Sequence, residues 1–317
     1  MPGRRVIVIS PRKSGTHLIQ RLLTGLGYGV WGDLGAPASD LVRLSVRERL
    51  DVARLVMPET AVAELDYRQH RADFIRVTNR AWADLARIWS FRLGTAAMRP
   101  YWPLQQPGAV SSPAWTGPFS TTPPGVAWIY HRLDLAAADP AFLFEWHDTG
   151  EPAIILNVRD PRDALVSLVA FLAGEARHGS LLTPDSQVHG PAMAALPDMK
   201  ARLAYAIRDP TLAFYEDYRS AIPLFAHPGV CRVSFEELVG PSGGGDPGRQ
   251  AAAVERVAEF LRVTDRDPGA VARSLYDTGS FTFRAGQAGT WRAEFSAHLE
   301  EQFAQRHGDL LTGLGYT

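Results

Sequence analysis

The fold of this chain is decided by residues 5–16, Arg5-Val6-Ile7-Val8-Ile9-Ser10-Pro11-Arg12-Lys13-Ser14-Gly15-Thr16. The β-branched run at its start is typical of a strand that is buried on both faces of a parallel sheet. After the polar loop, apolar residues from Leu18 to Leu26 recur at helical spacing until Gly27 ends the pattern. These residues therefore predict a strand, a loop and a helix in succession.

The loop between this strand and this helix is suited to binding phosphate. Free backbone N–H groups and the helix dipole favour an anion at a helix N-terminus, and Lys13 adds a cation. Lys13 and Lys200 are the only lysines in a chain rich in arginine, which is typical of a GC-rich genome and fits a bacterial origin. The alternative is an ordinary turn in which Ser10 or Ser14 caps the helix and Lys13 is solvated.

The composition predicts a globular protein with a sizeable core. The chain has 317 residues, of which 46% are hydrophobic and 21% are charged, and its net charge of -1 gives no general reason to bind nucleic acid or an anionic membrane. No stretch approaches the ~20 apolar residues of a membrane span, so we expect a cytoplasmic protein. The single cysteine, Cys231, lies in an apolar run and is expected to be a buried structural thiol.

Three further apolar runs predict strands, at residues 126–130, 153–158 and 230–234, and helical patterns follow them. Residues 40–94 have helical spacing with a break at Pro58, and residues 99–125 are an irregular segment rich in proline and aromatics. Strands that alternate with helices predict an α/β fold, doubly wound, with a mainly parallel sheet flanked by helices. We expect one domain over residues 1–317.

A second motif follows the predicted strand at 153–158. It runs Arg159-Asp160-Pro161-Arg162-Asp163-Ala164-Leu165-Val166-Ser167. Arg159 at the strand end is suited to a bidentate phosphate contact, and Ser167 could project from the same side of the helix. The alternative is a surface helix start in which Asp160 caps, Pro161 takes the first turn, and Arg162 and Asp163 are solvated.

A third motif lies near the end of the chain, at residues 284–292. It runs Arg284-Ala285-Gly286-Gln287-Ala288-Gly289-Thr290-Trp291-Arg292, and its glycines permit close backbone approach to an anion. By itself the string is equally typical of a glycine-containing loop with a buried tryptophan anchor.

Together the three motifs resemble the sulfotransferases that use 3′-phosphoadenosine-5′-phosphosulfate. The family's Pro-Lys-Ser-Gly-Thr loop appears with Arg12 inserted after Pro11, its Arg-x-Pro-x-Asp-x-x-x-Ser segment is intact from Arg159 to Ser167, and residues 234–238 are similar to its Tyr-Glu-Asp-Leu segment. The resemblance implies the P-loop-like sulfotransferase fold. It also implies that the first loop binds the 5′-phosphosulfate, that the second motif binds the 3′-phosphate, and that the third closes over that phosphate.

On this resemblance the predicted cofactor-binding residues are Arg12, Lys13, Ser14, Gly15, Thr16, His17, Arg159, Ser167, Phe235, Arg284, Ala285 and Gly286. Two departures from the family bear on them. Leu18 replaces a tryptophan that stacks on adenine, and Ala285 replaces a lysine of the third motif. No metal is expected, because the histidines lack tight metal-ligand spacing.

The predicted catalytic residues are Lys13, which would stabilise the leaving phosphate, and His131, which would take a proton from the acceptor. His131 follows the predicted strand at 126–130, where the family often has a histidine in a His-Leu-Pro context. Some members use a carboxylate instead, so Glu64 or Asp66 stays open as the base.

The predicted reaction is in-line transfer of a sulfuryl group to a hydroxyl or amine of a small molecule. A P-loop small-molecule kinase is disfavoured by the Lys-Ser-Gly-Thr order, and a non-catalytic nucleotide-binding protein of the same fold is the other alternative. We expect residues 31–125 and about 172–200 to be acceptor-side insertions. Tyr101, Trp102, Trp115 and Phe119 favour an aromatic or apolar acceptor, or else a small hydrophobic cluster. Homodimerisation stays open, since residues 292–301 partly resemble the family's dimer motif.

Overall fold

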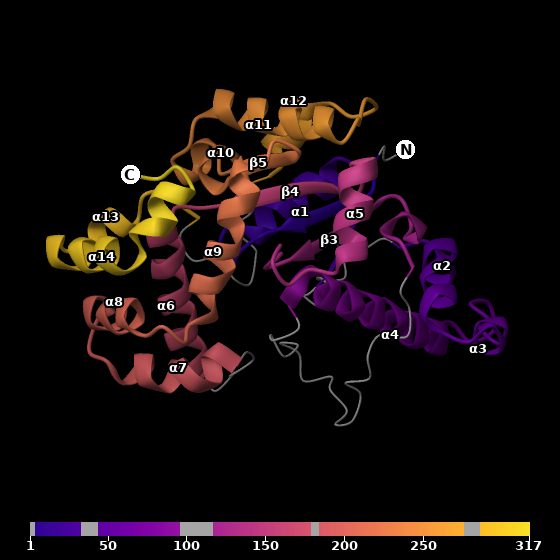
Figure 1. Ribbon diagram of the computed structural model, residues 1–317, viewed down its shortest axis with the longest axis horizontal. Helices are drawn as coiled ribbons and strands as arrows, with labels where there is room; N and C mark the ends of the chain where they lie inside the picture. Colours follow the sequence, from indigo (N-terminus) through magenta and orange to yellow (C-terminus); the bar gives the residue numbers. More distant parts are fainter. Residues whose placement is uncertain (1–3, 33–43, 96–116, 179–183, 276–285) are drawn as a thin grey trace.

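In the part of the chain that the structure describes, the sheet at the centre of the molecule has five strands, all parallel. The computed structural model describes residues 4–32, 44–95, 117–178, 184–275 and 286–317 (Figure 1). The strands are β1 (Val6–Ile9), β2 (Gly29–Gly32), β3 (Val126–Tyr130), β4 (Ala153–Val158) and β5 (Val230–Ser234), in the spatial order β2-β3-β1-β4-β5. The predicted α/β fold with a mainly parallel sheet is confirmed.

The central strand β1 is paired on both sides and is buried throughout. Val8 is aligned with Ile129 of β3 on one side and with Ile155 of β4 on the other. Because both faces of this strand are covered, it needs apolar side chains at every position, which explains the unbroken run of valine and isoleucine.

The edge strand β2 was not predicted. It pairs with β3 through Gly29 to Gly32, with Trp31 aligned with Trp128. A four-residue strand that begins and ends with glycine lacks the β-branched run by which strands are recognised. Its last two residues lie within the segment expected to be an insertion, and they belong to the sheet.

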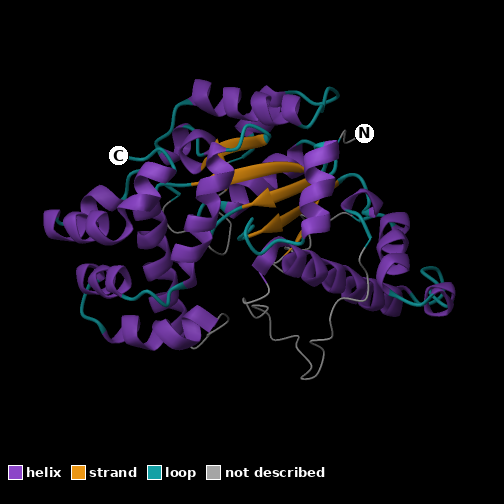
Figure 2. Ribbon diagram, viewed as in Figure 1, coloured by secondary structure: helices purple, strands orange, loops and turns teal. Residues whose placement is uncertain are grey.

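Helices cover both faces of the sheet, as a doubly wound fold requires (Figure 2). One face, which includes Val6 and Val8, is covered by α1 (Thr16–Gly25), α11 (Pro247–Phe260) and α12 (Pro268–Arg273). On the other face, Ile7 and Ile9 belong to a larger core with α4 (Arg71–Ser90), α5 (Pro140–Thr149), α6 (Pro161–His178) and α9 (Ala213–Ala226).

The remaining elements extend from these two layers. They are α2 (Val46–Val56), α3 (Glu59–Ala63), the π-helical turn η1 (Phe91–Thr95), the 3₁₀ turn η2 (Phe119–Thr121), α7 (Pro184–Ala195), α8 (Met199–Arg208), α10 (Phe235–Leu238), the 3₁₀ turn η3 (Pro241–Gly243), α13 (Trp291–Glu294) and α14 (Ala297–Gly313). The predicted break at Pro58 is confirmed, since α3 begins directly after it.

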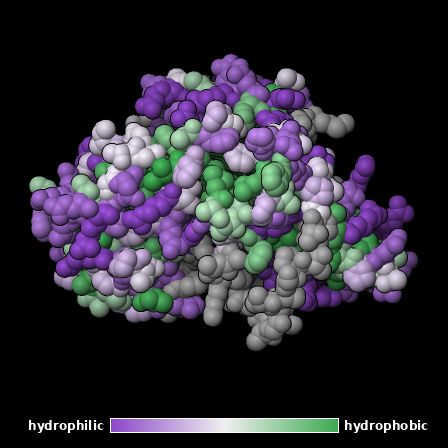
Figure 3. Space-filling model, in the orientation of Figure 1, coloured by the Kyte–Doolittle hydropathy of each residue, from purple (hydrophilic) through white to green (hydrophobic). Residues whose placement is uncertain are grey.

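The surface is mostly polar in the view of Figure 3, with apolar residues showing over α5, where Phe144 is exposed. Within the described part of the chain, no helix is both long enough and apolar enough to cross a membrane. Cys231 is buried as expected, and burial raises the pKa of its thiol to about 11.

The parallel arrangement brings three of the predicted site segments to one edge of the sheet. The first loop follows β1, His131 follows β3, and Arg159 follows β4, and these three strands are neighbours. The carboxyl ends of parallel strands lie at the same edge, which is where open α/β sheets bind ligands.

Candidate functional site

The first loop makes a tight turn between β1 and α1. The Ser14 N–H donates to the Pro11 carbonyl at 3.0 Å, and Lys13 and Gly15 have positive φ values of 65° and 94°. Gly15 is the N-cap of α1, and among the described residues no side chain caps this helix. The alternative in which Ser10 or Ser14 caps the helix is therefore wrong, and the N-terminal N–H groups of α1 are not taken by a capping side chain.

Ser10 joins this loop to the two neighbouring strands. Its Oγ lies 2.9 Å from both Ser14 Oγ and Thr16 Oγ1, and it accepts a hydrogen bond from Asn157 Nδ2 of β4 at 3.0 Å. Asn157 is fully buried and also donates to the Ser14 carbonyl at 3.2 Å. Two serines, a threonine and an asparagine therefore fix the loop on the sheet.

Gly15 is required by the close packing of Phe235, the first residue of α10. A Cβ atom at position 15 would lie 2.6 Å from Cδ2 of Phe235, and the φ of 94° is unfavourable for any residue with a side chain. The ring of Phe235 in turn lies 4.0 Å from the Arg159 guanidinium. Phe235 therefore connects the first loop to the second motif.

The two cations of the first loop lie in different surroundings. The Arg12 guanidinium is buried and forms an ion pair with Asp217 of α9, with Asp185 of α7 at 3.9 Å from Arg12 Nε. Lys13 is partly buried, with its Nζ 4.3 Å from the ring centre of Phe171 in α6. Of the two cations in this loop, Lys13 is the more accessible.

His131 is held against the same loop by its ring. Its Nδ1 lies 2.9 Å from the Ser10 carbonyl oxygen. A carbonyl can only accept a hydrogen bond, so Nδ1 carries the proton and Nε2 is the basic nitrogen. Burial and the charge of Arg12 lower the pKa of His131 to about 4, so the ring is neutral at neutral pH. A neutral imidazole with an unprotonated Nε2 can accept a proton, as a general base must.

The second motif forms the start of α6 as expected. Asp160 Oδ1 accepts a hydrogen bond from the Arg162 N–H at 2.9 Å, and Pro161 is the first helical residue. Arg162 and Asp163, however, are only 8% and 1% exposed. The interpretation of a surface helix start with solvated charges is therefore wrong at these two positions, because both side chains pack on the third motif.

Asp163 fixes the third motif to α6. Its carboxylate accepts hydrogen bonds from the Gly289 N–H, the Thr290 hydroxyl and the Trp291 N–H at 2.6, 2.8 and 2.7 Å. The Arg162 guanidinium lies 3.8 Å from the ring centre of Trp291. Three donors on one buried carboxylate hold the two motifs together more firmly than neutral hydrogen bonds would.

Arg159 lies between these two motifs. Its Nη2 donates to the Gln287 carbonyl at 3.0 Å, next to Gly286, which has a φ of 57°. Its Nε is buried without a hydrogen-bond partner among the described residues. A buried guanidinium N–H without a partner is costly, and an anion bound at this point would satisfy it.

The other predicted residues are placed as follows. Ser167 is partly buried on α6, and His17 is exposed on α1 with Nδ1 3.1 Å from Gln20 Oε1. Arg284 and Ala285 lie outside the described residues, as do Tyr101, Trp102 and Trp115. Phe119 is fully buried, with its ring 4.7 Å from that of Trp89, so it belongs to the hydrophobic core.

The carboxylates considered as alternative bases, Glu64 and Asp66, directly follow α3. This helix lies at one end of the molecule, far from α6 and from the ends of β1 and β3 (Figure 1). Asp66 there accepts hydrogen bonds from the N–H groups of Arg68 and Gln69. Of the three candidate bases, only His131 lies next to the first loop in the part of the chain that the structure describes. Neither Glu64 nor Asp66 does.

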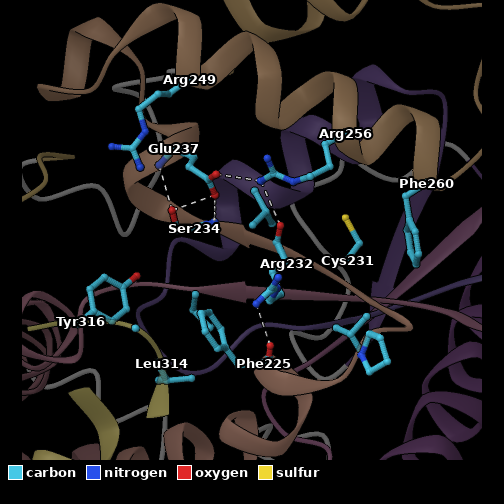
Figure 4. Close-up of a pocket in the computed structure, with 15 residues that line it drawn as sticks. Phe225, Cys231, Arg232, Ser234, Glu237, Arg249, Arg256, Phe260, Leu314 and Tyr316 are labelled. Atoms are coloured by element: carbon cyan, nitrogen blue, oxygen red, sulfur yellow. Dashed lines mark hydrogen bonds and ion pairs between the residues drawn. The ribbon is translucent and has the colours of Figure 1, made fainter. Parts of the chain in front are cut away.

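A cavity of about 590 Å³ lies elsewhere, along the edge strand β5 (Figure 4). Arg256 Nη2 on its wall donates to the Arg232 carbonyl and to Glu237, and Glu237 accepts the Ser234 N–H. None of the predicted site residues that the structure describes lines this cavity. It is separate from the candidate site.

Three site residues were not assigned from the sequence. Asn157 could have been noticed as a polar residue within an apolar strand, since buried polar groups are kept for their hydrogen bonds. Asp217 stands among aromatic residues on α9, which indicates burial. Nothing local to Asp163 indicates its role, because its partners lie more than a hundred residues later in the chain.

Comparison with known proteins gives the fold. A search of family models and a search of curated proteins found no match. Among solved structures, mouse sulfotransferase SULT7A1, crystallised with 3′-phosphoadenosine-5′-phosphate (PAP), has a TM-score of 0.52 at 13% identity, over 99% of this chain and 87% of that one. This chain has the sulfotransferase fold.

Two structures of retinol dehydratase are also similar, each with a TM-score of 0.44 and 16% identity. One is a complex with androsterone and PAP and the other a complex with retinol and PAP, and the matches cover 98% of this chain and 81% and 82% of those chains. The assignment of the fold rests on the mouse enzyme. It agrees with the expectation from the three motifs.

Proposed function

We propose that this protein is a sulfotransferase that moves a sulfuryl group from 3′-phosphoadenosine-5′-phosphosulfate to a hydroxyl or amine of a small molecule. The observation that carries the proposal is the position of His131. Its neutral ring presents a basic Nε2 and is hydrogen-bonded to Ser10, at the start of the loop that holds Lys13. A proton acceptor and a cation at one phosphate-binding loop are what sulfuryl transfer needs.

The residues present fit this donor. Among the residues that the structure describes, no side chain caps the N-terminus of α1 and none pairs with Arg159 Nε. The helix N-terminus and Lys13 suit the 5′-phosphosulfate, and Arg159 Nε suits the 3′-phosphate. Gly15, Gly286 and Gly289 allow close approach of the backbone to these anions. When bound, the donor supplies an activated sulfuryl group with the 5′-phosphate as the leaving group.

The transfer is an in-line displacement at sulfur. The acceptor oxygen or nitrogen forms a bond to sulfur while the bond between sulfur and the bridging phosphate oxygen breaks. The acceptor proton passes to His131 Nε2, and Lys13 stabilises the negative charge that develops on the leaving phosphate. Loss of Lys13 should therefore lower kcat, and arginine at this position should restore little because its fork does not present a compact charge.

Binding can be tested with PAP in the absence of magnesium. At a PAP concentration of about 100 times Kd we expect a stabilisation of about 2.7 kcal/mol, which is a rise in Tm of roughly 4 °C for a chain of this length. Stabilisation by magnesium-ATP alone would contradict the proposal and favour a small-molecule kinase.

Turnover is tested with a panel of phenols, alcohols, amines and sugars and the sulfuryl donor, with mass spectrometry of the products. We expect a product heavier by one sulfuryl unit. An aromatic or apolar acceptor is proposed from Tyr101, Trp102 and Trp115, since Phe119 belongs to the core. Binding of PAP without any product from such a panel would favour the non-catalytic alternative. A cytoplasmic location and a homodimer remain predictions.

A further inference from the structure

The inserted Arg12 is the residue that ties the first loop to the helices on the other side of the site. Its side chain is only 6% exposed, and its guanidinium forms an ion pair with Asp217 of α9. Asp185 of α7 lies 3.9 Å from Arg12 Nε. A charge is kept in the protein interior only where opposite charge compensates it, so these contacts fix where the Arg12 side chain lies.

The residue after Arg12 has an unfavourable backbone conformation. Lys13 has a φ of 65°, and only one other non-glycine residue in the described part of the chain, Arg262, has a positive φ. A side chain with a Cβ disfavours this region, so the surrounding contacts must hold the conformation in place. The anchored side chain of Arg12 lies next to this strained position in the chain.

We infer that Arg12 is a positioning residue, which ties the first loop to α9 through Asp217 and so holds Lys13 in the conformation that faces the donor. This inference rests on the proposed function for the role of Lys13. It differs from the expectation that Arg12 itself contacts the cofactor.

The carboxylates around Arg12 support positioning over direct contact. Asp217 is fully buried, and Asp217 Oδ1 and Asp185 Oδ2 have no hydrogen-bond partner among the described residues. Moving the guanidinium away toward a ligand would leave both carboxylates buried without the cation. Burial raises the pKa of Asp217 while the Arg12 guanidinium lowers it, so the charge of this carboxylate depends on the cation beside it.

The key variant is Asp217→Asn, which keeps the shape of the side chain and removes its charge. If Arg12 positions the loop, Asp217→Asn and Arg12→Met should each weaken PAP binding about tenfold or more, measured by calorimetry. If Arg12 contacts the donor directly, Arg12→Met should weaken binding while amide exchange at residues 13–15 stays unchanged in both variants, and that result would overturn the inference. Arg219→Met is the matched control, because it breaks an exposed ion pair between α9 and Asp309 of α14.

Arg12→Met leaves two buried carboxylates and can fail to fold. The double variant Arg12→Met with Asp217→Leu replaces the ion pair with apolar side chains of similar volume, a change that buried ion pairs often tolerate. Of the two carboxylates described around Arg12, it leaves only that of Asp185, which lies 3.9 Å from Arg12 Nε in the unchanged protein. It should fold, and it should bind PAP as weakly as Asp217→Asn does. Binding equal to that of the unchanged protein would overturn the inference.

Two readouts do not require the donor. Amide hydrogen exchange at residues 13–15 should be faster by about tenfold or more in Asp217→Asn, because the loop opens more often. The NMR titration midpoint of His131 should rise in the double variant, because Arg12 is one of the charges that lower it, together with Lys13.

If the unchanged protein does not bind PAP, the proposed function fails. Unchanged exchange and an unchanged titration in the variants would refute the Arg12 anchor itself.

Discussion

His131 makes the stability of the protein depend on pH in a calculable way. Its pKa is lowered from 6.5 to about 4 on folding, by burial first and then by Arg12. Between these values the unfolded chain binds a proton that the folded protein does not, so stability falls as the pH falls. Above about pH 6.5 both states are neutral at this residue and it contributes nothing.

The magnitude follows from the two pKa values. The proton-binding factor of each state is one plus ten raised to the power pKa minus pH. At about pH 5 this factor is roughly 30 times larger for the unfolded chain than for the folded protein, so His131 lowers the stability by about 2 kcal/mol relative to a residue that does not titrate. His131→Asn is the suitable replacement, because the Asn Nδ2 can donate to the Ser10 carbonyl as the histidine Nδ1 does.

The assay is denaturant unfolding of both proteins at about pH 8 and about pH 5. Lowering the pH should destabilise the unchanged protein by about 2 kcal/mol more than His131→Asn. His147→Asn, at an exposed histidine on α5, is the matched control for the substitution itself. Equal pH dependence of the unchanged protein and His131→Asn would refute the argument that the folded protein keeps this ring neutral.

Three further variants test the contacts that build the site. Asp163→Ala should lower the free energy of unfolding by about 3 kcal/mol and weaken PAP binding, because three buried donors lose their acceptor. Asp148→Ala, on the surface, is the control. Equal losses of stability in the two variants would contradict the role given to Asp163. Asn157→Leu should lower the free energy of unfolding, measured in urea, by roughly 1–3 kcal/mol, since Ser10 and Ser14 lose a donor. Leucine itself suits a buried strand, so a gain in stability would mean that these hydrogen bonds do not stabilise the loop. Gly15→Ala should weaken PAP binding about tenfold or more, because the new Cβ clashes with Phe235 and the φ is positive. Adding Phe235→Ala removes the clash alone and should restore only part of the binding. Full restoration would mean that the backbone conformation costs nothing.

Much of the fold could be predicted because its core strands are locally distinctive. The strands β1, β3, β4 and β5 are apolar runs bounded by turns, and each was placed within a residue or two. The edge strand β2 escaped because two of its four residues are glycine and it borders a stretch without a clear pattern. Its place in the sheet comes from pairing with β3, which is a tertiary contact.

The candidate site could be predicted only as separate segments. Parallel topology explains why the loops after β1, β3 and β4 meet, since strand ends on one edge must be neighbours. The contacts that fix these loops join residues far apart in the chain, such as Arg12 with Asp217 and Asp163 with Trp291. No local pattern records such pairs. The pairing of Arg12 with Asp217 is therefore not visible in the sequence, and Asp163 was left as a charge at a helix start.

The exposed side of β5 is already occupied by the protein's own polar groups. Arg256 bonds the Arg232 carbonyl and Glu237 bonds the Ser234 N–H, two backbone groups through which another chain could extend the sheet. Unpaired sheet edges are where folded proteins join one another into aggregates. By occupying these two groups, Glu237 and Arg256 leave fewer unpaired backbone groups on this edge with which another chain could pair.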